Sequence, residues 1–93
     1  MLDVIEQRIL LAILRSPGSS LTQILRAVGG GPTSVNHARK RLLEKGLIAE
    51  VYERKGKIRW NKQTLTRDGQ RVAELLAQID AILSEKATKR GVP

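Results

Sequence analysis

The segment Leu42-Leu43-Glu44-Lys45-Gly46-Leu47-Ile48 decides the fold of this 93-residue chain. Its first four residues fit the last turn of a helix. The glycine can take the positive φ that closes such a turn, because it has no Cβ. The two apolar residues that follow begin an extended segment with no linker. The sequence therefore predicts a helix over 33–45 that runs directly into a strand over 47–54.

Signals for helix starts and ends lie on the N-terminal side of this segment. Asp3 and Glu6 form an Asp-x-x-Glu capping box, apolar residues follow at helical spacing, and Ser16-Pro17-Gly18 ends the helix. A short extended link leads to a second helix. The run Gly29-Gly30-Gly31-Pro32 then forms the turn before the third helix, whose first turn can hold the proline. The expected helices on this side cover 3–15 and 21–28.

A second strand and a last helix are expected on the C-terminal side. A turn around Gly56 joins the first strand to a returning strand over 58–64, and Thr66 can cap the helix that follows it. We expect the chain to divide into a domain over 1–66, a helix over 67–88 and a basic, disordered tail over 89–93.

The composition restricts the classes of function. The net charge of +8 favours an anionic partner, of which nucleic acid is the commonest for a compact domain and a membrane surface the next. The absence of cysteine excludes disulfides, thiol chemistry and Cys-ligated zinc. Charged residues interrupt the N-terminal apolar residues, and no apolar run approaches the roughly 20 residues that span a bilayer. We therefore expect a cytoplasmic protein with no membrane partner.

Catalytic and metal sites are not expected. His37 is the only histidine, so it has no second ligand or nucleophile of its kind nearby in the sequence. The glycine run at 29–31 lacks the Lys-Ser/Thr pair that a phosphate-binding loop requires. The chain is expected to be no enzyme and to hold no cofactor.

Basic residues concentrate in the third helix and the hairpin. Between residues 33 and 59, eight Lys or Arg stand against three Glu, which gives +5 of the net +8. At 100° per residue Val35, Ala38 and Leu42 share one face of the helix, and polar residues lie opposite. A solvated helix face or a charged hairpin edge would also be polar. The concentration of one charge sign in these two elements favours contact with a nucleic acid.

The aromatic residues Tyr52 and Trp60 lie on the two hairpin strands. We expect them to pack in the core rather than to stack on bases. The core otherwise consists of aliphatic residues, since the chain has no phenylalanine.

The last helix carries apolar residues at 72, 75, 79 and 82, the alternating spacing of a coiled-coil seam. The stripe runs about 20 residues, near 30 Å by helical rise, which is longer than a small three-helix core needs. This length predicts a homodimer formed by the last helix together with the first. The residues expected at the dimer interface are Ile5, Ile9, Val72, Leu75, Leu76, Ile79, Ile82 and Leu83.

The order of helices and hairpin resembles the winged helix-turn-helix family, particularly the small MarR- and PadR-like transcription regulators and their archaeal relatives. The matching pieces are Leu21-Thr22-Gln23-Ile24-Leu25, Thr33-Ser34-Val35-Asn36, Glu44-Lys45-Gly46-Leu47-Ile48 and Leu65-Thr66-Arg67-Asp68-Gly69. The resemblance covers nearly the whole chain. It implies an α+β, mostly α fold, with a three-helix core, a two-stranded β-wing and a long C-terminal helix for dimerisation.

The same resemblance implies a sequence-specific regulator of transcription that binds double-stranded DNA and is associated with the nucleoid. The recognition helix 33–45 would lie in the major groove and the wing 51–61 on the backbone or minor groove. Two alternatives remain open: a protein-interaction module, or an RNA-binding module in a transcription or ribosomal complex. The expected DNA-binding residues are Thr33, Ser34, Asn36, His37, Lys40, Arg41, Arg54, Lys55, Lys57 and Arg59.

Overall fold

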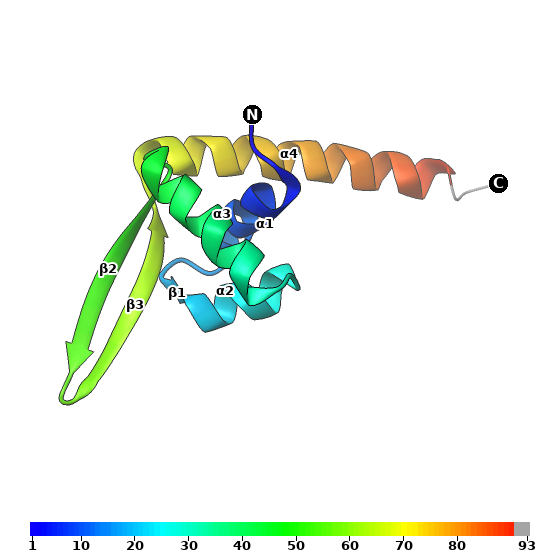
Figure 1. Cartoon of the computed structure of the whole chain (residues 1–93). Helices are drawn as coiled ribbons and strands as arrows, with labels where there is room; N and C mark the ends of the chain where they lie inside the picture. Colours follow the sequence, from blue (N-terminus) through cyan, green and yellow to red (C-terminus); the bar gives the residue numbers. More distant parts are fainter. Residues whose placement is uncertain (91–93) are drawn as a thin grey trace.

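The computed structural model describes the backbone of residues 1–90 and the side chains of residues 1–85 (Figure 1). The predicted class, α+β and mostly α, is confirmed, and every predicted helix and strand begins and ends within two residues of the observed one. No helix in the described part of the chain is both long enough and apolar enough to cross a membrane. The elements in chain order are α1 (Val4–Arg15), β1 (Ser19–Ser20), α2 (Leu21–Val28), α3 (Pro32–Glu44), β2 (Ile48–Lys55), β3 (Ile58–Leu65) and α4 (Arg67–Arg90).

The first two helices begin with reciprocal caps. The Asp3 carboxylate accepts a hydrogen bond from the Glu6 N–H at 2.8 Å, and the Glu6 carboxylate accepts one from the Asp3 N–H at 3.3 Å. Ser20 and Gln23 form the same arrangement at the start of α2. Each box satisfies two of the backbone donors that a helix start leaves unpaired. The caps therefore fix where α1 and α2 begin.

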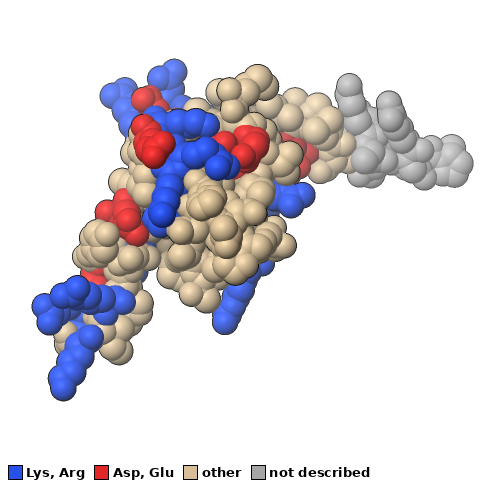
Figure 2. Space-filling view, in the orientation of Figure 1, with Lys and Arg blue, Asp and Glu red and all other residues tan. Residues whose placement is uncertain are grey.

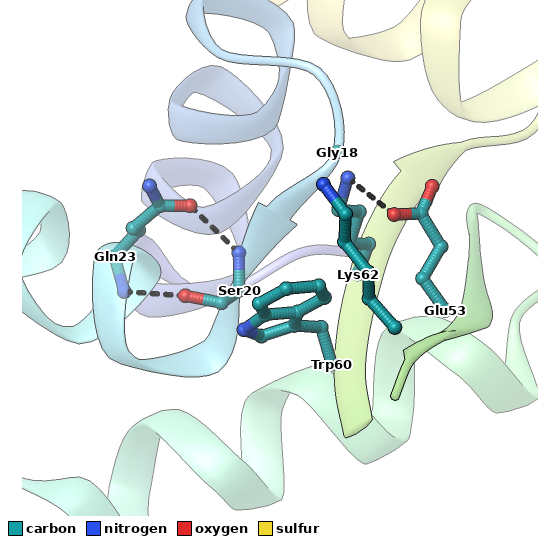
Figure 3. A pocket seen from close by; sticks show the side chains of 7 residues that line it. Gly18, Ser20, Gln23, Glu53, Trp60 and Lys62 are labelled. Carbon is teal, nitrogen blue, oxygen red and sulfur yellow. Dashed lines mark hydrogen bonds and ion pairs between the residues drawn. The ribbon is translucent and has the colours of Figure 1, made fainter. Parts of the chain in front are cut away.

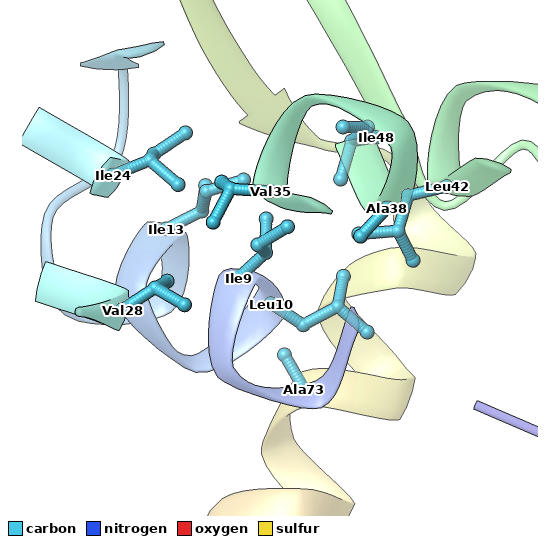
Figure 4. Close-up of a cluster of buried hydrophobic side chains, with 10 residues drawn as sticks. All are labelled: Ile9, Leu10, Ile13, Ile24, Val28, Val35, Ala38, Leu42, Ile48 and Ala73. Carbon is cyan, nitrogen blue, oxygen red and sulfur yellow. The ribbon is translucent and has the colours of Figure 1, made fainter. Parts of the chain in front are cut away.

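The core lies where α1, α2 and α3 meet, and it is closed by the start of β2 and by α4 (Figure 4). The face of α3 that the helical spacing assigns to the core is buried, as predicted. Ile9 has no exposed surface, so the prediction that it lies at an interface between chains is wrong: α1 uses this position for the domain's own core. The buried apolar residues are Ile9, Leu10, Ile13, Ile24, Val28, Val35, Ala38, Leu42, Ile48 and Ala73.

The end of α3 has the geometry expected from its glycine. Gly46 has φ of 72°, and its N–H donates to the Leu43 carbonyl at 3.1 Å. The Leu47 N–H donates to the Leu42 carbonyl, also at 3.1 Å. These two bonds form a Schellman motif, which ends the helix and directs the chain straight into β2.

The start of α4 is held against this same turn. The Thr66 hydroxyl donates to the Gly46 carbonyl at 2.6 Å and accepts from the Gly69 N–H at 3.1 Å, so Thr66 caps α4 as predicted. A Cβ on Gly69 would lie 1.7 Å from the carbonyl oxygen of Leu47. Only glycine permits this approach, and the two sequence motifs on either side of the hairpin therefore meet in space.

The sheet has three strands in the order β1-β3-β2, with both pairs antiparallel. The predicted wing had two strands, and the third is the link at Ser19 and Ser20, which pairs with Gln63 and Lys62. This short strand fastens only the base of the hairpin, and β2 and β3 extend beyond it as the wing (Figure 1).

Helix α4 is partly a core element and partly a projecting one. Ala73 is buried, and Val72 and Leu76 pack against the core, so the first turns of α4 belong to the domain that was expected to end at 66. The helix still contacts α1 at Asp80, whose Oδ2 lies 3.8 Å from the Arg15 Nη2, and it then projects past the other elements (Figure 1). It continues to Arg90 rather than ending at 88, and the rest of the predicted tail, 91–93, lies outside the described residues.

Candidate nucleic-acid interface

The first half of α3 presents a polar surface. Thr33, Ser34, His37 and Lys40 are exposed, on the side of the helix away from its buried apolar face. Asn36 is half-buried, and its Oδ1 accepts hydrogen bonds from the Arg39 Nε and Nη2 at 3.2 and 2.8 Å. Of the basic residues predicted on this helix, Lys40 is the one that forms no ion pair within the described part of the chain.

Arg41 faces α1 instead. Its Nη2 lies 2.7 Å from the Asp3 Oδ2, and its Nε lies 3.5 Å from the Glu6 Oε1. Lys45, one turn later, places its Nζ 2.7 Å from the Glu6 Oε2. This geometry argues against the predicted base contact for Arg41, because the same guanidinium would have to leave two carboxylates to reach DNA.

Glu6 is the centre of this cluster. Its side chain is only 3% exposed, and it faces two cations and the backbone N–H of Asp3. The Glu6 N–H bonded to Asp3 and the nearby Arg41 guanidinium hold the pKa of the Asp3 carboxyl below its ordinary value. We call Asp3, Glu6, Arg41 and Lys45 the α1–α3 charge cluster.

A second charged group joins α3 to the base of the wing. The Arg39 Nη1 lies 3.5 Å from the Glu50 Oε1, and the Gln63 Nε2 donates to that same oxygen at 3.2 Å. Arg39 Nη1 and Gln63 Oε1 are both buried without a hydrogen-bond partner among the described residues. The strands that carry the wing are thus attached to α3 by a buried polar contact.

The wing carries basic side chains without internal partners. Arg54 and Arg59 are directly opposite each other in the register of β2 and β3, and Lys55 is opposite Ile58. Opposed residues share a face of the sheet, so the two arginines project on one side and Lys55 on the other. Lys57 lies in the turn, beside Gly56 at φ of 65°. None of these four cations forms an ion pair with the residues that the structure describes.

The pairing of Arg54 with Arg59 is unfavourable in the absence of an anion, because like charges directly opposite on a strand pair repel. Figure 2 shows basic side chains gathered at the end of the wing, whereas basic and acidic side chains are interleaved over the upper part of the molecule. The end of the wing therefore carries positive charge that no ion pair with the described residues compensates.

The aromatic residues do not pack in the core as predicted. Tyr52 is 70% exposed and Trp60 is 38% exposed, because the wing extends beyond the helices that cover the sheet base. The Trp60 indole lies beside Ser20 at the start of α2 (Figure 3). It lines a recess of about 420 Å³ that also contains the ion pair between Lys62 and Glu53, at 2.9 Å.

The residues predicted at a dimer interface fall into two sets. Ile9 lies in the domain's own core, and Ile5, Val72 and Leu76 pack against it. Leu75, Ile79, Ile82 and Leu83 of α4 are each more than half exposed, and their spacing puts them on one face of the helix. The second set forms an exposed apolar stripe along α4.

Several solved structures share this fold over nearly the whole length of the chain. A mutant of ZitR from Lactococcus lactis superposes with a TM-score of 0.89 at 21% identity, and the match covers 98% of this chain and 61% of that one. SPO1453, a MarR family transcriptional regulator from Silicibacter pomeroyi, gives 0.83 at 17% identity, over 96% and 62% of the two chains. FabT from Streptococcus pneumoniae, solved in complex with DNA, gives 0.80 at 20% identity, over 99% and 63%.

The chain thus spans a little over three-fifths of the length of these three neighbours. No curated protein sequence matches it. The family model of winged helix-turn-helix DNA-binding proteins matches residues 2–49, which include α1, α2, α3 and the start of β2. With that match over half of its length, the chain belongs to the winged helix-turn-helix DNA-binding family.

Proposed function

We propose that this protein binds double-stranded DNA as a homodimer and regulates transcription. The observation that carries the proposal is the distribution of uncompensated positive charge over two elements of a DNA-binding fold. Lys40 on α3 and the four wing cations have no acidic partner among the described residues, whereas Arg39 and Arg41, the other cations of α3, are paired. Such a protein would act in the cytoplasm, on the nucleoid.

The exposed part of α3 would lie in the major groove. Lys40 can donate to guanine O6 and N7, and the Asn36 amide nitrogen can donate to adenine N7, while its Oδ1 accepts from Arg39. Thr33, Ser34 and His37 would reach phosphates or base edges near the helix start. Arg41 does not belong to this set, because the α1–α3 charge cluster holds it. The wing cations Arg54, Lys55, Lys57 and Arg59 would contact the backbone or the minor groove.

The roles of helix and wing can be separated by two variants, once a preferred site has been selected from a random pool of duplexes. Lys40→Ala should weaken the preferred site by about 1 to 3 kcal/mol more than random DNA, if Lys40 reads a base. Lys57→Ala should weaken both about equally, because a phosphate contact carries little sequence information. The roles are wrongly assigned if only the wing variant changes the sequence preference.

Double-stranded RNA is the alternative partner with the same charge. Measured at one fixed salt concentration, the affinity for duplex DNA should exceed that for an RNA duplex of the same sequence. The major groove of A-form RNA is too deep and narrow for side chains to read. Tighter binding to the RNA duplex would contradict the proposal.

The apolar stripe of α4 supports the homodimer. Leu75, Ile79, Ile82 and Leu83 would be covered by the same helix of a second chain, giving a symmetric interface. The two recognition helices would then reach successive major grooves about 34 Å apart, and the preferred site would be an inverted repeat.

Ile79→Glu tests this assembly, because it buries an unpaired charge in the proposed seam. We expect sedimentation to show a dimer for the unmodified protein at tens of micromolar and a monomer, with much weaker DNA binding, for the variant. Gln78→Glu adds the same charge at an exposed neighbouring position and is the control. A monomeric unmodified protein, or a dimeric Ile79→Glu protein, would rule out this assembly.

A further inference from the structure

A groove of about 670 Å³ lies between the start of α2 and the wing. The helix contributes Thr22, and the wing contributes Tyr52 from β2 together with Arg59 and Asn61 from β3. The groove exists because β1 covers only the base of β3, so the strand continues past the end of β1 with α2 beside it. We call it the α2–wing groove.

The polar side chains of the α2–wing groove have no internal partners. Tyr52 and Asn61 are opposite each other in the strand register, and both are exposed. The Tyr52 hydroxyl, the Asn61 amide and the Thr22 hydroxyl form no side-chain hydrogen bond with any residue that the structure describes. Ser20, which also lines the groove, has a partner within the chain: its hydroxyl accepts a hydrogen bond from the Gln23 N–H in the cap of α2. Three side chains with neutral donors therefore face the solvent, on α2 and on both strands of the wing.

The strand register places these donors between two charged pairs. Side chains alternate along a strand, so Glu50–Gln63, Tyr52–Asn61 and Arg54–Arg59 form successive cross-strand pairs on one face of the wing. The first pair contacts Arg39 of α3, which shows that this face is the one turned toward α3. Tyr52 and Asn61 therefore lie on the wing face that is turned toward α3, between the contact with Arg39 and the unpaired Arg54 and Arg59.

The two faces of the wing differ in how their charges are arranged. The opposite face carries Glu53, which forms an ion pair with Lys62. The α2–wing groove contains Arg59 and no carboxylate among its lining residues. A surface of neutral donors beside an unpaired guanidinium suits an extended anion whose oxygens accept several hydrogen bonds, and a phosphodiester backbone has this chemistry.

We propose that the α2–wing groove holds one strand of the DNA backbone, with Tyr52, Asn61 and Thr22 donating hydrogen bonds to phosphate oxygens. This inference rests on the proposed DNA binding and adds contacts that lie neither on α3 nor at the wing tip. Because the three side chains are uncharged, they add affinity without releasing counterions. Their contribution is the same for every DNA sequence and does not change the slope of log K against log salt.

The test is duplex DNA binding by Tyr52→Phe and Asn61→Ala at several salt concentrations. Each variant removes donors from an exposed side chain and should leave the fold unchanged. We expect each to weaken binding to preferred and random duplexes alike by roughly tenfold, as for the loss of a hydrogen bond to a charged acceptor, with an unaltered salt slope. Val51→Thr, on the opposite face of the same strand, is the matched control and should bind as the unmodified protein does.

The outcomes separate this inference from the function on which it rests. If Tyr52→Phe and Asn61→Ala bind DNA with the affinity of the unmodified protein, the groove contact is overturned. If Arg54→Ala still weakens binding in the same experiment, the proposed DNA binding stands. Equal losses in Val51→Thr, or a shallower salt slope in Tyr52→Phe, also overturn it, since the loss would then come from a displaced wing. If the unmodified protein binds no duplex at low salt, it is the proposed function that fails.

Discussion

The α1–α3 charge cluster and the wing use the same kinds of basic residue in opposite ways. Arg41 and Lys45 face Asp3 and Glu6, at distances of 2.7 Å for the closest contact of each. Arg54 and Arg59 lie opposite each other in the strand register and form no ion pair within the described part of the chain. A count of charges along the sequence treats these four residues alike. The structure separates cations that hold α1 to α3 from cations that remain available to a polyanion.

The division between these regions predicts opposite effects on stability and on DNA binding. Changes at the helix junction should lower the free energy of unfolding and leave DNA contacts intact. Changes in the wing should do the reverse, because every residue of 51–61 is exposed.

The largest effect is expected from Gly69→Ala, at the junction of α3 and α4. Alanine favours helices by about 1 kcal/mol over glycine, so propensity alone predicts stabilisation. The added Cβ would instead lie 1.7 Å from the Leu47 carbonyl oxygen, which forces the two elements apart. We expect urea unfolding to show a loss of more than about 3 kcal/mol. Gln70→Ala, one residue later and exposed, is the control, and equal stabilities of the two variants would contradict the packing.

Glu6→Gln should have the next largest effect. It keeps the shape of the side chain but leaves Arg41 and Lys45 without their shared carboxylate. Because both cations are about 40% exposed and can turn to water, we expect a loss of roughly 1 to 3 kcal/mol, less than for a fully buried pair. DNA affinity should be kept or should rise, since Lys45 is released while Arg41 keeps its contact with Asp3. A loss of DNA affinity in the still-folded variant would contradict the division between the two regions.

Arg54→Ala should show the opposite pattern. The free energy of unfolding should change by less than about 0.5 kcal/mol, because the residue is exposed and unpaired. Its removal also relieves repulsion with Arg59. DNA binding should weaken, and the salt slope should become shallower by about 1 for each phosphate that the variant no longer neutralises, hence about 2 per dimer. Glu53→Gln on the other face of the wing provides a comparison that should not make the slope shallower.

The smallest effect concerns acid stability at Asp3. A carboxyl whose pKa is lower in the folded than in the unfolded protein stabilises the fold above its ordinary value, here 3.8, and loses that contribution as the pH falls through the lower folded value. The unmodified protein should therefore lose more stability between pH 5 and pH 3 than Asp3→Asn, which keeps a good N-cap but cannot titrate. Chemical unfolding at the two pH values measures this, and identical losses would show that Asp3 does not contribute to acid stability.

Local chemistry made most of the fold predictable from the sequence. Asp3 and Glu6, Gly46, Thr66 and the apolar spacing in α3 each specify a cap, a turn or a buried face through nearby residues. The strand β1 is predicted only as a link, because two residues carry no alternation pattern and their pairing with β3 depends on distant sequence. Ile9 is wrongly assigned to a dimer interface because helical spacing identifies an apolar face without telling what covers it.

The candidate site was predictable only where local sequence determines it. The wing cations follow from the sequence because the hairpin and its charges are local. The pairing of Arg41 with Asp3 joins residues 38 positions apart and leaves no local signal. The exposure of Tyr52 and Trp60 depends on how far the wing projects beyond α2. Asn61 could have been found, since alternation from Arg59 places it on the same face of the strand.

The salt dependence of duplex DNA binding by the unmodified protein is the sharpest test of binding through uncompensated charge. Its unpaired cations should contact about 4 to 8 phosphates per dimer, so log K should fall against log salt with a slope of roughly −4 to −7. We predict a slope in that range for the unmodified protein. Arg54→Ala should make the slope shallower, and Glu6→Gln should not. A slope near zero, or no binding at low salt, would contradict DNA binding through these cations.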